Sequence, residues 1–212
     1  GSEMCKETDY QQWNLSLQRS IGTDLLFETA YVGSKGTKLY TNNFFNVPSP
    51  GPGPIAPRRL FPQFGPGSLQ TTEATSHYHG LVLRSEKRLS RGLMLMANYT
   101  FSKCIDLDSL AASVVSTNLD QDPRNKRAER ALCNHDARHR FVLSTTYDLP
   151  SLTQRPGLSV LLGGWQIGGI ITLQSGQPFT VNITSDRANI GVLNQRPNVL
   201  RNPNPVSYTH LR

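Results

Sequence analysis

The sequence predicts an all-β fold, an antiparallel meander of about six long strands that is part of a large transmembrane β-barrel with long extracellular loops. Two observations predict it. Apolar and polar residues alternate with a period of two in about six stretches of roughly ten residues, which is the pattern of a β-strand with two different faces. The connections between these stretches are alternately short and long, so tight turns gather at one end of the sheet and large loops at the other, as in outer-membrane barrels.

The first predicted hairpin joins strands at residues 10–20 and 24–32 through a tight turn. In the first strand, Trp13, Leu15 and Leu17 alternate with polar residues. In the second strand both alternating sets contain apolar residues, so the pattern leaves its facing open.

The second predicted hairpin joins strands at 78–88 and 93–102, again through a tight turn. Leucines alternate with polar or charged residues in the first of these strands, and leucines and aromatic residues alternate with methionines and polar residues in the second. A long, proline-rich connection, 33–76, precedes this hairpin, and a long polar connection, 103–139, follows it. We expect both connections to be loops at the same end of the sheet.

The last predicted hairpin comprises residues 140–149 and 164–173. The uncharged stretch 158–185 is long enough to be considered as a membrane helix. Its glycines and glutamines and Pro178 argue against a helix in lipid, and its alternation favours a strand.

The alternation also predicts which side chains face lipid. A sheet that spans a membrane must close into a barrel because lipid cannot satisfy backbone polar groups, so its apolar side faces outward. Aromatic side chains are expected near both ends of that side, at the level of the lipid headgroups. The predicted lipid-facing residues are Trp13, Leu15, Leu17, Leu81, Leu83, Leu93, Leu95, Tyr99, Phe101, Phe141, Leu143, Tyr147, Trp165, Ile167, Ile171 and Leu173.

Several stretches resemble the barrel of TonB-dependent outer-membrane receptors, most closely the Oar-like type. They are 31–39, 92–106, 127–130, 135–149 and 161–181, together with QQWNLSLQR near the start. The resemblance covers roughly residues 10–200. It implies the bacterial outer membrane as location and the energised uptake of a substrate that the sequence does not identify.

The resemblance also implies partners and a larger whole. Receptors of this family have about 22 strands around a plug, so we interpret the chain as an internal barrel fragment. Its partners would be outer-membrane lipid, the remainder of its own barrel and plug, and the TonB complex through a missing N-terminal part. We expect an unassigned start at 1–9, the partial barrel at 10–200, and an unstructured tail at 201–212 that is non-native from residue 206.

The sequence predicts no enzyme and no cofactor. It contains no nucleophile elbow, no phosphate-binding glycine loop and no paired carboxylates on one strand. Cys133, His135, Asp136 and His139 are zinc-ligand types, but their spacing is not that of a standard zinc site, so no metal is expected. The net charge of +7 is scattered before it clusters near residues 124–140, and we expect no nucleic-acid partner.

Two features of the long connections leave alternatives open. The residues Phe45, Arg58, Arg59, Phe61 and Phe64 are a possible substrate-contacting loop, or belong to a semi-rigid surface loop.

Cys104 and Cys133 lie near the two roots of one connection. They are either a disulfide, which an oxidising compartment allows, or two free thiols.

An alternative class also accounts for the strands and the polar composition: a secreted, soluble β-sandwich that serves as an adhesin or carbohydrate-binding module. A sandwich would bury its apolar residues in a dry core between two sheets. It would leave the alternation of short and long connections unexplained.

Overall fold

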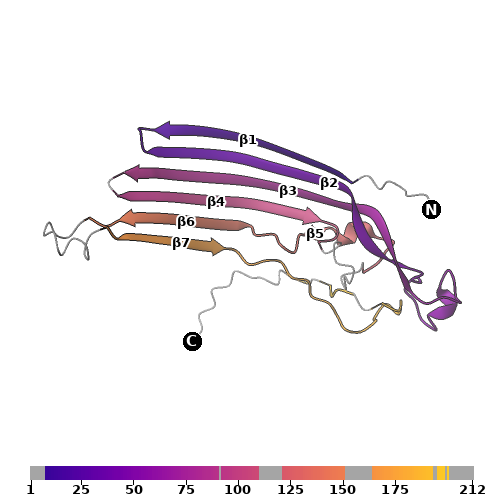
Figure 1. Ribbon diagram of the computed structural model, residues 1–212. Coiled ribbons are helices and arrows are strands. Elements are labelled where there is room, and N and C mark those ends of the chain that lie inside the picture. The colour runs from indigo at the N-terminus through magenta and orange to yellow at the C-terminus, as the bar shows by residue number, and fades with distance from the viewer. Residues whose placement is uncertain are drawn as a thin grey trace, which may run out of the picture.

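The alternating residues form strands that pair with their neighbours along the chain (Figure 1). The computed structural model describes residues 8–90, 92–109, 121–150, 164–192, 195–198 and 200. The strands are β1 (Asp9–Ile21), β2 (Leu25–Phe45), β3 (Gly67–Ser90), β4 (Leu93–Asp106), β5 (Ala131–Leu132), β6 (His139–Asp148) and β7 (Gln166–Gln174). Two short 3-10 helices are η1 (Ala56–Arg58) and η2 (Lys126–Glu129). The predicted tail at 201–212 and residues 1–7 of the predicted start lie outside the described residues.

The sheet is an antiparallel meander with the order β1-β2-β3-β4-β6-β7, and the short β5 pairs with the end of β4. This confirms the predicted fold class, in which about six long strands follow one another. The sheet is open within the described residues, since β1 and β7 are its edges. The same residues contain no helix that is long and apolar enough to cross a membrane.

The tight turns lie at one end of the sheet and use glycine where the backbone requires it. Gly22 has a φ of 64° between β1 and β2, and Gly92 has a φ of 76° between β3 and β4. At Gly92 a Cβ atom would also lie 2.9 Å from the backbone oxygen of Asp148, so the turn packs directly against β6. A larger residue would meet both obstacles at this position.

The first long connection differs from the prediction. Most of residues 33–76 extends the β2–β3 hairpin, and only residues 46–66 are a loop. The register of the extension shifts between Gly36 and Leu39 and again between Leu39 and Thr41. Period-two alternation predicts a strand only where the two faces meet different surroundings, and the polar residues of this extension lie on both faces.

The pairing register brings the predicted apolar residues onto one side. Leu15 pairs with Tyr31, Tyr31 with Leu81, and Leu81 with Phe101. This assigns the facing of β2, which the sequence left open. We call this side the apolar face; within the paired strands it contains Trp13, Leu15, Leu17, Phe27, Tyr31, Leu81, Leu83, Leu93, Leu95, Tyr99, Phe101, Phe141, Leu143, Tyr147, Ile167, Ile171 and Leu173. Trp165 lies immediately before β7 and outside the register.

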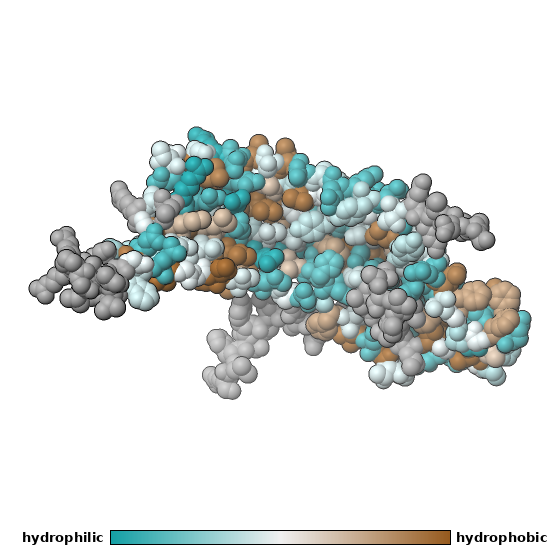
Figure 2. Space-filling view, in the orientation of Figure 1, coloured by the Kyte–Doolittle hydropathy of each residue, from teal (hydrophilic) through white to brown (hydrophobic). Residues whose placement is uncertain are grey.

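The described part of the chain has no hydrophobic core. Its buried apolar residues are Ala30, Ala74, Cys104, Cys133, Ile190 and Val192. Large side chains of the apolar face stay exposed even on inner strands: Leu83 is 40% exposed and Phe101 is 42% exposed. Hydrophobic residues therefore lie on the surface of the sheet, among hydrophilic ones (Figure 2). The β-sandwich alternative does not fit, because the described residues form one sheet layer and bury no core.

The opposite side of the sheet, which we call the polar face, carries charged side chains in the middle of the strands. Arg84 of β3 lies 2.8 Å from a carboxylate oxygen of Glu86 and 3.9 Å from one of Glu28 on β2. Arg84 pairs with Glu28 on one side and with Asn98 on the other in the register. These ionic side chains at mid-strand suit a water-filled interior and not a dry one.

Candidate functional site

Three segments gather at the end of the sheet opposite the tight turns (Figure 1). They are residues 46–66 between β2 and β3, 107–138 between β4 and β6, and 175–198 after β7. We call the described residues of these segments the loop cap. Loops on a rigid scaffold are where proteins most often place their binding residues, so the cap is the candidate functional site.

A single asparagine organises the first segment. Asn46 adopts a φ of 61°, a left-handed conformation that asparagine tolerates better than most residues. Its side-chain amide donates to the carbonyl oxygens of Phe61 at 2.9 Å and Phe64 at 3.0 Å. Its side-chain oxygen accepts the backbone N–H of Phe61 at 3.0 Å. The loop therefore holds a fixed shape by itself.

The first segment is tied to the third by two side chains that reach across. Arg58 donates to the carbonyl oxygens of Ser49 at 2.7 Å and of Asn189 at 2.5 Å. Asn189 donates in return to the carbonyl oxygens of Gly51 at 2.9 Å and Gly53 at 2.8 Å. Two segments that are far apart in the sequence thus form one continuous surface.

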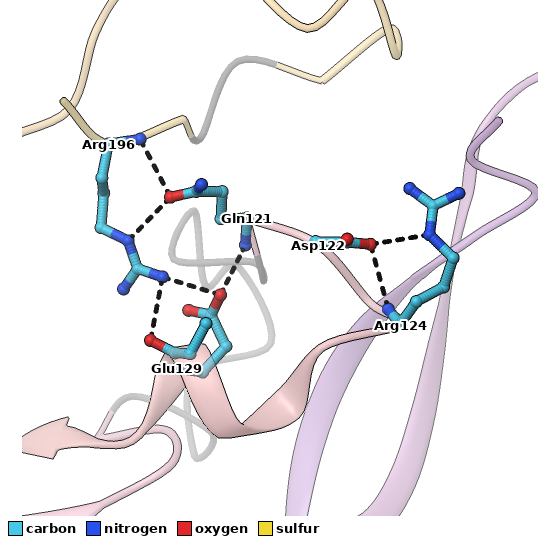
Figure 3. Close-up of polar contacts among 6 residues, drawn as sticks. Gln121, Asp122, Arg124, Glu129 and Arg196 are labelled. Atoms are coloured by element: carbon cyan, nitrogen blue, oxygen red, sulfur yellow. Dashed lines mark hydrogen bonds and ion pairs between the residues drawn. The ribbon is translucent and has the colours of Figure 1, made fainter. Parts of the chain in front are cut away.

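The second and third segments are joined through Arg196 (Figure 3). Its guanidinium donates to the side-chain oxygen of Gln121 at 3.0 Å and lies 2.8 Å from a carboxylate oxygen of Glu129. Arg124 in turn donates to the hydroxyl of Ser49 at 3.0 Å, which links the second segment to the first. Charge-assisted hydrogen bonds of this kind are stronger than neutral ones, so the three segments are held as a unit.

Asp186 fixes the turn within the third segment. Its carboxylate accepts the backbone N–H of Gly191 at 2.6 Å and of Ile190 at 3.0 Å, and the side-chain amide of Gln195 at 2.6 Å. Burial acts to raise the pKa of Asp186, but the hydrogen bonds from Ile190, Gly191 and Gln195 outweigh it and hold the pKa below its usual value.

The cap lines an open pocket of about 580 Å³. This volume lies in the range of small-molecule sites, roughly 300–1,000 Å³. The pocket carries three guanidinium groups and one carboxylate; among the described residues the exposed side chain of Arg187 has no hydrogen-bond or ion-pair partner. The lining residues are Pro50, Gln121, Asp122, Arg124, Ile183, Ser185, Arg187, Ala188, Ile190, Gln195, Arg196, Pro197 and Asn198. The pocket can therefore bind a polar or anionic group.

The predicted substrate-contacting residues lie at the tip of the β2–β3 hairpin and do not line this pocket. The rings of Phe45 and Phe61 are 5.9 Å apart, and Phe64 is 60% exposed. Arg58 is committed to the loop contacts described above, and Arg59 donates to the carbonyl oxygen of Phe64 at 3.3 Å. The structure thus brings the aromatic residues together at the surface and uses the arginines to hold the loop.

Sequence reasoning did not find the pocket. Arg124, Arg187 and Arg196 come from two segments that no periodic pattern relates. The clustering of positive charge near residues 124–140 was the one available signal, and it includes only the first of the three.

The two cysteines of the second long connection form a disulfide. Cys104 and Cys133 are bonded, with their Cα atoms 5.3 Å apart, and Cys133 is fully buried. The backbone N–H of Cys104 donates to the buried carboxylate of Asp136 at 2.7 Å. The disulfide therefore closes the root of the 107–138 segment.

The cysteine and histidine cluster does not assemble a metal site in this state. Cys104, Cys133 and His135 are the one group of three potential ligands among the described residues. The two sulfurs are bonded to each other, so His135 is the one member of this group that could still ligate a metal. The ring of His139 lies tilted against that of Phe101 on the apolar face, with ring centroids 5.1 Å apart.

The fold by itself indicates which class of protein this is. An open antiparallel sheet with an exposed apolar face, a polar opposite face, tight turns at one end and large loops at the other is part of a membrane-spanning β-barrel. The chain matches the family described as outer membrane beta barrel domain over residues 3–211, and it belongs to that family. Its location is the bacterial outer membrane. Neither the curated proteins nor the solved structures give a match.

Proposed function

We propose that the chain is a barrel segment of a TonB-dependent transporter that takes up a substrate across the outer membrane without catalysing a reaction. The observation that carries this proposal is the polar face, because it suits the wide, wet interior of a large barrel. The stretches that resemble Oar-like receptors support the finer assignment. The partners in this proposal are lipid, the remainder of the barrel with its plug, and the TonB complex.

The apolar face is the side that meets lipid in this proposal. Its large side chains, such as Leu83 and Phe101, are exposed on inner strands where a water-soluble sheet would cover them. Aromatic residues stand near both of its ends, with Trp13 toward the loop cap and Tyr147 toward the tight turns. Such girdles are expected at the two headgroup levels.

The polar face is the side that meets the barrel interior. Small barrels of about eight strands fill their interior with packed side chains, whereas barrels of about 22 strands hold a plug. The ionic group of Glu28, Arg84 and Glu86 needs water or a polar plug beside it, because unsolvated charges are costly. A large barrel with a polar interior agrees with this arrangement.

The loop cap is the proposed place of substrate capture. Phe45, Phe61 and Phe64 offer an exposed aromatic surface at the hairpin tip. The pocket that Arg187 lines offers a site for a polar or anionic group of the same substrate. Both belong to one hydrogen-bonded unit at the mouth of the barrel, where an incoming molecule first meets the protein.

The test uses the full-length protein that contains this chain, extracted from outer membranes in detergent. The purified periplasmic domain of TonB is added, and complex formation is measured by co-purification. We expect binding that is lost when the segment preceding the barrel is deleted. A full-length protein with no plug and no binding to TonB would overturn the proposal and leave an outer-membrane barrel of another kind.

A further inference from the structure

The apolar face ends, toward the loop cap, in a row of aromatic rings. The indole of Trp13 on β1 covers Gly33 of β2, and only a glycine leaves room for it there. The same indole lies 6.3 Å from the ring of His79 on β3. The Tyr31 hydroxyl and the Nδ1 atom of His79 are 2.7 Å apart, and Phe101 continues the row on β4. These rings mark the level of the lipid headgroups.

Positive side chains stand on the same face at the level of these rings and just beyond it. Lys103 pairs with His79 in the register. Lys35 pairs with His77, one step further out. The guanidinium of Arg138 lies 5.9 Å from the centre of the Phe101 ring, which places it on this face as well.

Arg130 completes this row. Ile105 pairs with His77 on one side and with Leu132 of β5 on the other. Arg130 comes directly before β5 with an extended backbone, and it lies near enough to His77 for its charge to act on that ring. Burial and the charges of Arg130 and Lys35 lower the pKa of His77, which lies outside the predicted membrane-spanning part of β3. We call Lys35, Lys103, Arg130 and Arg138 the basic row.

The basic row is not neutralised by the protein. None of its four members forms an ion pair among the described residues. The acidic residue of this face in β1, Asp9, lies 3.8 Å from Lys38. Lys35, Lys103 and Arg130 are exposed. A cluster of unpaired cations at one level of a membrane-facing surface attracts anions at that level.

We propose that the basic row binds the phosphate groups of lipopolysaccharide, the phosphorylated glycolipid of the outer leaflet. The charge is complementary, and the aromatic rings beside and beneath the row set the height at which headgroup phosphates lie. Lys35 and Lys103 are two strands apart, roughly 10 Å at about 4.8 Å per strand, so the row can contact more than one phosphate. The inference rests on the assignment of the apolar face to lipid and not on transport.

The test measures binding of diphosphoryl lipid A to the full-length protein, purified in detergent and stripped of lipopolysaccharide. In one variant the charges of the row are removed by Lys35→Gln, Lys103→Gln and Arg130→Gln. Since each cation near an anionic surface is worth about a factor of five, we expect the dissociation constant to rise roughly a hundredfold. Dephosphorylated lipid A should bind to the parent protein as weakly as lipid A binds to this variant.

A matched control removes three positive charges elsewhere, by Arg19→Gln, Arg88→Gln and Arg140→Gln, none of which lines the pocket or belongs to the row, and should leave lipid A binding within about twofold. Migration of unheated samples on gels checks that both variants are folded barrels. TonB binding should be unchanged in the row variant, which separates this inference from the proposed function. Equal binding by row variant and parent, an equal loss in the control, or displacement of lipid A by millimolar inorganic phosphate would each overturn the proposal.

Discussion

Leu143 is the position at which the two faces of the sheet can be compared most directly. It lies on the apolar face in β6, between Ala97 of β4 and Ile171 of β7. His139 and Tyr147 stand at equal separations on either side of it along the same strand. At about 3.4 Å per residue, Leu143 is roughly 14 Å along the strand from each of these residues. It therefore lies near the middle of an apolar band that is about 25 Å tall in barrels of this class.

The substitution Leu143→Arg is expected to destabilise the folded barrel by about 2–4 kcal/mol, the cost of a lipid-facing arginine at the bilayer midplane. This corresponds to a factor of roughly 30 to 700 in the unfolding equilibrium. The matched control is Val142→Arg. Val142 lies on the polar face between Asn98 and Thr172, where the guanidinium can stay hydrated, so we expect less than about 1 kcal/mol.

The measurement is a urea titration of the full-length protein folded into lipid vesicles, followed by tryptophan fluorescence. The expected result is a lower midpoint for Leu143→Arg and a midpoint close to the parent for Val142→Arg. The reasoning fails if both variants lose the same stability, or if Val142→Arg loses more, because either result would mean that the apolar face does not meet lipid.

Three further outcomes are expected. Replacing Cys104 and Cys133 by serine should speed tryptic cleavage of the 107–138 segment in the full-length protein, since a disulfide closing 29 residues is worth about 3–4 kcal/mol of loop entropy; unchanged cleavage would argue against it. Because hydrogen bonds lower the pKa of Asp186, its stabilising effect is present above about pH 4 and is lost as the pH falls through its folded-state value; protection of the Ile190 amide from hydrogen exchange should drop there, and should be pH-independent in Asp186→Asn. Expressed alone, the chain should be insoluble without detergent, because both sheet edges and the apolar face are uncovered; a soluble monomer with cooperative unfolding would contradict this.

The strands could be predicted from the sequence wherever one face differs from the other. β1 was expected at 10–20 and spans Asp9–Ile21, and β6 was expected at 140–149 and spans His139–Asp148. The alternation of β2 was ambiguous because both of its faces carry apolar residues. Only its pairing with β1, which places Tyr31 opposite Leu15, resolves the facing.

The loop cap could not be predicted in this way. Its contacts join residues from separate segments, such as Arg196 with Gln121 and Glu129, and they follow no period along the chain. The role of Asn46 depends on a left-handed backbone and on carbonyl groups that converge only in the folded loop. The aromatic residues of the same loop were visible in the sequence, but the commitment of Arg58 to backbone oxygens was not.

The sequence predicts strands that stop well before the observed ends of β2 and β3 near the hairpin tip, and the place where the predicted strands stop has a physical meaning. Hydrocarbon makes a polar side chain costly on one face only, so it enforces the alternation, whereas water on both faces does not. The alternation of β3 is clear from Leu81 inward, and beyond His79 polar residues occupy both faces up to the hairpin tip. The membrane boundary therefore falls at the level of Trp13, Gly33 and His79, although the hydrogen-bonded ladder continues past it. This boundary rests on the alternation along β3 and on the pairing register. It coincides with the aromatic row and with Lys103, the innermost member of the basic row, so lipid and its headgroups account for both patterns.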